Sequence, residues 1–316
     1  MKVLVTGADG FVGRHLVRHL VSAGDDVAAG CRPGGDPVDW SNGSGPPRVE
    51  PLPLEITDSA SVYAALEWRP DAIVHLAAVA SIREARRDPR AAWVVNAAGT
   101  ALLASAAAEL RERRAADPLV LVVSTGEVYG AGPRTARSET DPLLPRSPYA
   151  ASKVGAEVAA LGERRRTGLR VVIARPFPHT GAGQATHYAV PAFAERLRAA
   201  AASGAATVPT GNLDPVRDLL DVRDVVGAYR LLLVKGVPGE AYNVARGEGQ
   251  SVGEVFARLA AITGSRAQPR PDPSLVRRAE IPYLVGDSTK LRRATGWAPT
   301  IDLEQTLREL IDAQAH

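Results

Sequence analysis

The chain has 316 residues, which is enough for one large domain or two modest ones with a buried core. Its content of 45% hydrophobic and 23% charged residues is typical of a globular protein and excludes an intrinsically disordered chain. The 38 basic and 35 acidic residues nearly balance, so charge gives no reason to expect nucleic-acid binding and is compatible with a small anionic substrate. The single cysteine, Cys31, excludes an intrachain disulfide and a cysteine metal cluster, and we expect no metal site.

The N-terminus has no signal-peptide pattern, because Met1 leads directly into the apolar segment 2–6. No uninterrupted run of about 18 apolar residues appears anywhere, so the sequence predicts no membrane span. We therefore expect a cytoplasmic protein without a membrane partner.

Short apolar segments alternate with longer amphipathic ones through the first half of the chain. Strands are predicted at 2–6, 26–30, 71–76, 119–124 and 169–174, and helices at 11–23, 59–68, 91–113 and 148–166. Strands that are apolar throughout and alternate with helices predict an α/β fold with a doubly wound parallel sheet of the Rossmann type. The stretch 32–53 is rich in proline and glycine, and it is predicted to be a long loop.

The pattern loosens after Arg175. Helices are predicted at 189–202, 222–234, 251–263 and 303–313, and a strand at 240–244. We expect a dinucleotide-binding domain at 1–174, to which 219–245 returns. A smaller α/β substrate-binding lobe is expected from 175–218 and 246–316.

Three glycines follow the first predicted strand and open the first predicted helix. Gly7, Gly10 and Gly13 have the spacing G-x-x-G-x-x-G. Glycines let the backbone turn tightly and approach a pyrophosphate at the positive end of a helix. A glycine-rich turn without a ligand is the alternative, but the position between strand and helix favours a dinucleotide site.

The second predicted strand is followed by Cys31 and Arg32, without an acid. NAD sites usually carry an acid there for the ribose hydroxyls, whereas a guanidinium suits the 2′-phosphate of NADP. The sequence thus favours NADP(H), with NAD(H) still possible. The alternative is that Arg32 is an exposed loop residue.

A proton-transfer pair is predicted on the helix 148–166. Tyr149 and Lys153 are four residues apart and share a helix face, so the lysine can lower the pKa of the phenol. The phenol could then exchange a proton with a substrate oxygen while hydride moves to or from nicotinamide. Thr125 is predicted at the carboxyl edge of a parallel strand, where it can hydrogen-bond the same oxygen. An accidental pair on an exposed helix is the alternative.

The motifs at 7–13, 75–78, 124–130 and 147–153 together resemble the extended short-chain dehydrogenase/reductase family, whose members act on nucleotide sugars as epimerases, dehydratases and reductases. The resemblance covers essentially the whole chain and implies Thr125, Tyr149 and Lys153 as the catalytic triad. It also implies a largely structural role for Asn96. The cofactor contacts expected from the resemblance are Gly7, Gly10, Phe11, Val12, Gly13, Glu55, Ile56, Leu76, Ala77, Ala78, Tyr149, Lys153 and Pro176, and Arg32 is added because of its place after the second predicted strand.

The second half narrows the resemblance. Segments 169–184 and 211–226 are similar to GDP-4-keto-6-deoxy-D-mannose reductases, and the latter also to GDP-mannose 4,6-dehydratases. The resemblance implies that Arg217 clamps the substrate diphosphate, and a guanidinium is a good bidentate phosphate ligand. A surface pair of Arg217 with Asp218 is the alternative. Arg278 and Glu280 resemble a nucleotide-contacting pair, with a solvated turn as the alternative.

Two positions bear on the reaction. Pro178 stands where the family usually has a substrate-contacting Asn, so the substrate or its pose is expected to differ from the family norm. Glu127 matches a glutamate that takes part in dehydration in the dehydratases, although reductases can also carry an acid nearby; a loop-orienting role is its alternative. Dehydratases often have a further polar or acidic neighbour where this chain has Gly126, and this favours simple carbonyl reduction.

We therefore expect an NAD(P)H-dependent reductase of the C4 ketone of a nucleotide-linked 4-keto-6-deoxyhexose, with GDP-4-keto-6-deoxy-D-mannose as the expected substrate. A 4,6-dehydratase or a 4-epimerase that retains its cofactor is the second reading, and a non-catalytic nucleotide sensor is the third. The long, alanine-rich helices at 91–113 and 148–166 match those that pair across a two-fold axis in the family, so we expect a homodimer.

Overall fold

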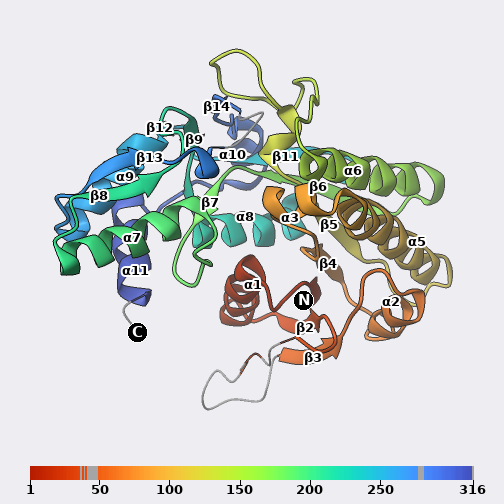
Figure 1. The fold of residues 1–316 in the computed structure, drawn as a ribbon. Coiled ribbons are helices and arrows are strands. Elements are labelled where there is room, and N and C mark those ends of the chain that lie inside the picture. The colour runs from red at the N-terminus through yellow and green to blue at the C-terminus, as the bar shows by residue number, and fades with distance from the viewer. Residues whose placement is uncertain (36–37, 39, 41–48, 277–280, 315–316) are drawn as a thin grey trace.

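A computed structural model of the chain describes residues 1–35, 38, 40, 49–276 and 281–314. Its main feature is a seven-stranded parallel sheet in the order β11-β6-β5-β4-β1-β2-β3 (Figure 1). The strands are β1 (Lys2–Thr6), β2 (Asp26–Cys31), β3 (Val49–Pro53), β4 (Ala72–His75), β5 (Leu119–Val123), β6 (Arg170–Pro176) and β11 (Ala241–Val244). The strand order reverses beside β1, as in doubly wound folds, and the predicted fold class is confirmed.

Helices cover both faces of this sheet. One face carries α1 (Phe11–Ser22) and α8 (Val222–Lys235), and the other carries α2 (Ser59–Leu66), α5 (Gly99–Glu112) and α6 (Pro148–Thr167). The alternation of side chains along β1 shows the division, because Val3 and Val5 join the core under α1 and α8 while Leu4 joins the other core. A strand with both faces covered must be apolar throughout, which is the pattern seen in the sequence.

The prediction of one long loop at 32–53 is wrong at its end, because Val49–Pro53 forms the edge strand β3, paired with β2 alone. The strand contains Pro51 and Pro53, which cannot donate ladder hydrogen bonds and are therefore tolerated only at a sheet edge. Its side chains are mostly exposed, so it lacks the apolar pattern of the central strands.

The predicted helix at 91–113 is interrupted. The helix begins with α4 (Pro89–Ala92), passes through a π-helical turn at Trp93–Ala98, and continues as α5. A π-helical turn shifts the register of the side chains and is frequent at functional sites. Within the described residues, one helix, Pro89–Glu112, is long and apolar enough by length and composition to span a membrane, and 50% of its apolar stretch is buried inside the protein.

The rest of the chain forms a smaller lobe of short strands and helices. Its elements are β7 (His179–Thr180), α7 (Ala189–Ser203), β8 (Thr207–Thr210), β9 (Val216–Asp218), β10 (Leu220–Asp221), β12 (Gly249–Ser251), α9 (Val252–Thr263), β13 (Gln268–Pro271), β14 (Tyr283–Leu284) and α11 (Leu303–Ala313). Helix α10 (Thr289–Thr295) instead packs against β11 and α8, and its Leu291 joins the core under α1 and α8. Helices α7, α9 and α11 share a hydrophobic core in which the rings of Phe193 and Phe256 meet edge to face, 5.4 Å apart. The predicted helices in this half are all present. We propose two domains, one formed by residues 1–174 and 219–245 and the other by residues 175–218 and 246–316.

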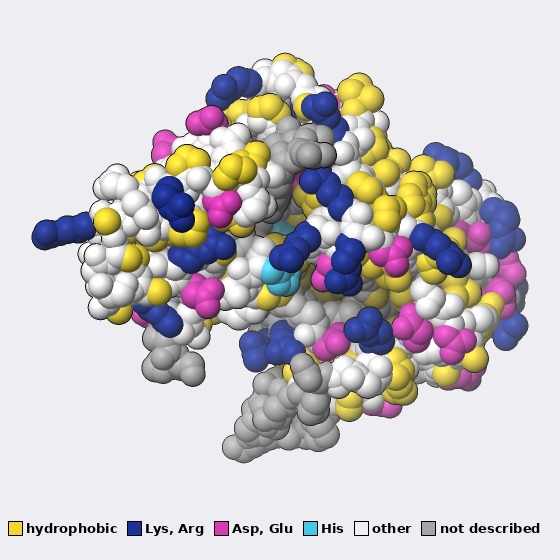
Figure 2. Space-filling model, in the orientation of Figure 1, with side chains coloured by type: hydrophobic (Ala, Val, Ile, Leu, Met, Phe, Trp, Pro, Cys, Tyr) yellow, Lys and Arg dark blue, Asp and Glu magenta, His cyan; other side chains and the backbone are white. Residues whose placement is uncertain are grey.

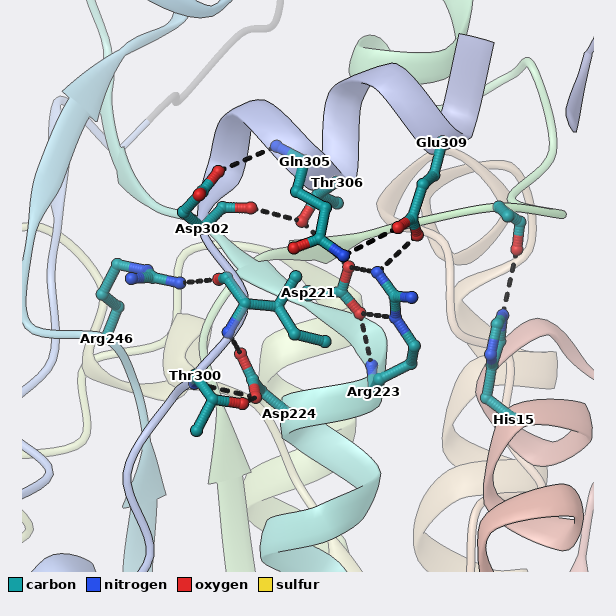
Figure 3. A network of polar contacts seen from close by, with 12 residues as sticks. His15, Asp221, Arg223, Asp224, Arg246, Thr300, Asp302, Gln305, Thr306 and Glu309 are labelled. Carbon is teal, nitrogen blue, oxygen red and sulfur yellow. Dashed lines mark hydrogen bonds and ion pairs between the residues drawn. The ribbon is translucent and has the colours of Figure 1, made fainter. Parts of the chain in front are cut away.

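Polar contacts fasten the C-terminal helix α11 to the start of α8 (Figure 3). The buried carboxylate of Asp221 accepts hydrogen bonds from Arg223 and from the Thr306 hydroxyl at 2.9 Å. Arg223 also forms an ion pair with Glu309 at 2.6 Å. These contacts hold the smaller lobe against the helix that covers β5 and β6.

Candidate active site

The glycine loop between β1 and α1 has the geometry that a dinucleotide needs. Gly7 has a φ of +69°, and a Cβ there would stand 2.9 Å from the backbone nitrogen of Ala77. A Cβ at Gly13 would stand 2.3 Å from the Gly7 carbonyl oxygen. The loop is thus packed so closely that only glycine fits at Gly7 and Gly13, and no side chain caps the N-terminus of the twelve-residue helix α1. The residues present fit a pyrophosphate at this helix end.

A chain of hydrogen bonds orders the loop after β4. The Thr100 hydroxyl donates to the Asn96 carbonyl at 2.5 Å, so the buried His75 must donate from Nε2 to Thr100, at 3.0 Å. His75 Nδ1 then accepts from the Thr6 hydroxyl at 2.8 Å, and Thr6 Oγ1 accepts from the Ala77 amide at 3.1 Å. Burial lowers the pKa of His75 to about 3, so the ring is neutral. The proposed cofactor contacts Leu76, Ala77 and Ala78 follow this anchored histidine.

Asn96 links this loop to the helix α6, which carries Tyr149 and Lys153. Its side-chain oxygen accepts from the Val79 amide at 2.8 Å, and its side-chain nitrogen donates to the Val79 carbonyl at 3.1 Å and to the Ser152 hydroxyl at 2.9 Å. Asn96 lies in the π-helical turn. The contacts are consistent with the structural role that the family resemblance implies.

Thr125 and Tyr149 come together at the carboxyl edge of the sheet. Thr125 follows β5, and Tyr149 lies in the first turn of α6, whose N-cap Ser147 accepts from the Ala150 amide at 3.1 Å. The Tyr149 hydroxyl hydrogen-bonds to the Thr125 side chain. Burial raises the pKa of Tyr149 well above its usual value, and the nearby Glu127 raises it further. Tyr149 therefore keeps its proton in the ligand-free protein and can act as an acid.

Lys153 lies one turn along α6 from Tyr149 and is buried. Its ammonium group donates to the carbonyl of Val123, the last residue of β5, at 2.9 Å. Burial lowers the pKa of Lys153 to about 8, against the effect of Glu157, which raises it. Lys153 thus joins α6, which carries Tyr149, to the end of β5, which precedes Thr125.

The position between Thr125 and Glu127 leaves little room for a side chain. A Cβ at Gly126 would stand 3.1 Å from three ring atoms of the buried Phe177. The Glu127 amide donates to Thr125 Oγ1 at 3.3 Å, so the turn also orients the threonine. Phe177 follows Pro176, the proposed cofactor contact at the end of β6.

At the other end of the proposed cofactor site, no acid directly follows β2 in the sequence, but the fold brings one from another segment close to the end of this strand. The Asp9 carboxylate lies close enough to Cys31 to raise the pKa of the thiol, although burial is the larger cause. Arg14 acts in the opposite direction on the same thiol. Arg32 is exposed and lies near Glu55, whose carboxylate accepts from the Thr57 amide at 3.0 Å and hydroxyl at 2.7 Å.

Sequence reasoning missed Asp9 and Arg14 because the fold brings the glycine loop against β2. Ile56, the other residue predicted near the adenine, is buried against Gly99. The described residues contain no group of three or more His, Cys, Asp or Glu side chains that could hold a metal ion.

One predicted substrate-binding residue, Arg217, lies in the smaller lobe. Arg217, on β9, donates to the carbonyl of Ile281 at 2.8 Å and to that of Val216 at 2.9 Å. Asp218 is fully buried and accepts from the Arg246, Gly247 and Gly286 amides, so it is no surface residue. Lys and Arg side chains surround the junction of the two halves on the face that Figure 2 shows. Arg278 and Glu280 lie outside the described residues.

Pro178 has no backbone amide hydrogen and contributes a carbonyl to the smaller lobe. Its carbonyl accepts from the Leu220 amide at 2.9 Å, which joins β7 to β10. The next side chain, His179, stacks on Phe11 with ring centroids 6.4 Å apart, and His15 contacts the Ala182 carbonyl at 3.0 Å. The segment after β6 therefore contacts the start of α1.

The fold and the site define an oxidoreductase of the extended short-chain dehydrogenase/reductase type that uses a nicotinamide dinucleotide. A family model described as GDP-mannose 4,6 dehydratase matches residues 4–310, and the chain belongs to this family of nucleotide-sugar enzymes.

Several proteins of this type are similar to the chain along its full length. The GDP-6-deoxy-D-mannose reductase of Pseudomonas aeruginosa is 34% identical over 98% of this chain and 96% of its own. A solved structure described as RMD from Pseudomonas aeruginosa complexed with NADPH has a TM-score of 0.81 at 32% identity, covering 99% of this chain and 98% of that one. The UDP-glucose 4-epimerase of Thermus thermophilus, solved with NAD, has a TM-score of 0.86 at 30% identity, with coverage of 99% and 98%.

Proposed function

We propose that this protein reduces the C4 ketone of a nucleotide-linked 4-keto-6-deoxyhexose, with GDP-4-keto-6-deoxy-D-mannose as the substrate. The observation that carries the proposal is the Thr125–Tyr149 hydrogen bond above the buried Lys153, together with Gly126 in place of a further polar side chain. Similarity to a GDP-6-deoxy-D-mannose reductase supports the GDP-sugar class.

The chain's own residues account for the proton. Thr125 and Tyr149 would both hydrogen-bond the C4 oxygen, and Tyr149 would donate its proton as negative charge develops there. Lys153 would stabilise the tyrosinate that remains. When bound, the nicotinamide cofactor would supply the hydride.

Arg217, on the strand β9 of the smaller lobe, would hold the substrate diphosphate, because a planar guanidinium can bind phosphate through two hydrogen bonds. The residues Arg278 and Glu280 are proposed to contact the nucleotide. At the adenosine end, Arg32 and Arg14 favour a 2′-phosphate and hence NADPH, whereas Asp9 acts against it.

A cofactor-retaining dehydratase or epimerase is the second candidate. Glu127 favours it, since this carboxylate lies near enough to Tyr149 to raise the pKa of the phenol. Against a dehydratase, position 126 carries no second acid, and a side chain there would press against the buried ring of Phe177.

The test is to mix the purified protein with candidate 4-keto-6-deoxy sugar nucleotides and NADPH or NADH and to follow nicotinamide absorbance. A reductase consumes one cofactor for each sugar reduced. Conversion of GDP-mannose or of a 4-epimer pair without net cofactor consumption would instead establish the second candidate.

A further inference from the structure

A buried ion pair lies one helical turn beyond Lys153. Glu157, on α6, accepts from Arg175 Nε at 3.0 Å and from Arg175 Nη2 at 2.7 Å, so the two planar groups are paired through both oxygens. The glutamate is 2% exposed and the arginine 6%. Lys153 and Glu157 are four residues apart and therefore share a face of α6.

Arg175 also contacts the segment that carries Thr125. Its Nη1 donates to the Tyr129 hydroxyl at 3.0 Å, and this hydroxyl donates to Asn243 Oδ1 at 2.6 Å. Tyr129 ends the 3₁₀ turn Gly126–Tyr129, for which Thr125 is the N-cap. One guanidinium thus joins the catalytic helix, the threonine turn and the strand that ends at Pro176.

The pair is not explained by stability alone. Two buried charges lose their hydration, and replacing such a pair by apolar side chains of similar volume is often neutral or stabilising. The position of the Glu157–Arg175 pair beside Lys153 points to a different role. Lys153 is itself buried, and burial disfavours the charge of its ammonium group.

The groups that face Lys153 single out one carboxylate. His75, on β4, interacts with the lysine but is neutral, and Tyr149 keeps its proton. Val123 offers a carbonyl without a charge. Glu157 is the carboxylate that raises the pKa of the ammonium group, and Arg175 fixes the position of that carboxylate.

We propose that the Glu157–Arg175 pair is a positioning device for Lys153, in which Glu157 keeps the buried ammonium group protonated and Arg175 holds Glu157 in place. The proposal concerns the ligand-free protein and does not depend on which sugar nucleotide is reduced. Its test can therefore fail or succeed separately from the proposed function.

The lysine content of the chain makes the test direct. The sequence has only Lys2, Lys153, Lys235 and Lys290, so protein labelled with ¹³C-lysine gives four side-chain signals to follow by NMR against pH. Lys153→Arg identifies the signal of interest. In the wild type we expect Lys153 to titrate at about pH 8. In Glu157→Gln this midpoint should fall by about one pH unit, the lower end of the effect of an adjacent opposite charge, while the other three stay fixed.

Glu163→Gln is the matched control. Glu163 is on the same helix and pairs with Arg166 at 2.6 Å, far along α6 from Lys153, so all four midpoints should stay as in the wild type. A second variant, Glu157→Leu with Arg175→Met, removes both charges at similar volume and carries the test if the single variant does not fold. Because the positive charge of Arg175 opposes the effect of Glu157 on the ammonium group, removing both charges should lower the Lys153 midpoint, but by less than Glu157→Gln does.

The proposal is overturned if the Lys153 midpoint in the folded variants stays at the wild-type value. It is equally overturned if all four lysines shift together, because that result would report a general rearrangement. Loss of activity without a change in the midpoint would assign the pair a purely structural role.

Discussion

The side-chain amide of Asn96 donates to the Ser152 hydroxyl at 2.9 Å and so joins the π-helical turn to the catalytic helix α6. The Ser152 hydroxyl in turn donates to the Tyr149 carbonyl at 2.8 Å. Because Asn96 also bonds both polar backbone atoms of Val79, one side chain holds the loop after β4 and the helix that carries the tyrosine.

Replacing Asn96 by Ala should therefore affect stability. The change leaves the Val79 amide and carbonyl without their buried partner, and we expect the free energy of unfolding to fall by about 1–3 kcal/mol. Urea unfolding followed by circular dichroism measures it. Asn212→Ala is the control, since Asn212 is exposed and bonds only locally with the Asp214 amide in the described contacts. Equal stability of the two variants would contradict the expected effect.

Tyr149→Phe should lower turnover by about 10²–10⁴-fold, because the phenolic proton is lost while the ring remains. Cofactor binding should change little and can be measured by quenching of intrinsic fluorescence. Tyr63→Phe, which removes a hydroxyl bonded to Glu109 at 2.6 Å, provides a control outside the site. Turnover near that of the wild type would remove Tyr149 from the mechanism.

The pH dependence of reduction should follow Lys153. Burial lowers the pKa of the lysine to about 8, so its positive charge is present below that pH and is lost as pH rises through it. Tyr149, whose pKa is raised, still carries its proton over the same range. We expect kcat/KM for ketone reduction to fall above about pH 8. In Lys153→Arg the guanidinium stays charged, so a slower enzyme without this alkaline decline is expected, and a decline at the same pH would assign it to another group.

Arg32→Ala should weaken NADPH binding and leave NADH binding nearly unchanged. A charge-assisted hydrogen bond contributes about 1.5–3 kcal/mol, which corresponds to a loss of roughly ten- to a hundredfold in affinity. Titration calorimetry with both cofactors measures the ratio. Asp9→Asn should strengthen NADPH binding, because it removes a negative charge near Cys31. Unchanged cofactor preference in the Arg32 variant would exclude the arginine as the 2′-phosphate ligand.

The long helices on one face are predicted to form a homodimer interface. Trp93 and Val94 in the π-helical turn and Val158 on α6 are large apolar side chains that remain exposed in the single chain. A Cβ at Gly155 would stand 2.7 Å from the Trp93 ring, so the two helices approach closely there. Sedimentation equilibrium at micromolar concentration should give the molar mass of a dimer.

Val158→Glu should shift this equilibrium to the single chain, because a charge in the centre of an apolar interface loses its hydration. Val237→Glu is the matched control, since Val237 is 53% exposed, compared with 63% for Val158, and follows α8 instead. Dissociation in both variants, or in neither, would argue against an interface at α6.

Local patterns in the sequence were enough to predict the class of fold and to point to Tyr149 and Lys153 as the proposed catalytic pair. The glycine spacing at 7–13 and the Tyr149–Lys153 spacing each lie within a few residues, so their geometry follows from one turn or one helical face. The central strands were recognisable because coverage on both faces demands apolar side chains throughout.

The tertiary structure decided what depends on contacts between distant segments. It placed Asp9 beside Cys31, paired Glu157 with Arg175 across 18 positions, and seated the Phe177 ring against Gly126. It also turned the proline-rich end of a predicted loop into β3, since an edge strand needs a partner on one side only. No periodicity in the sequence encodes such contacts, because they form only when the parallel strands bring their carboxyl ends to one edge of the sheet.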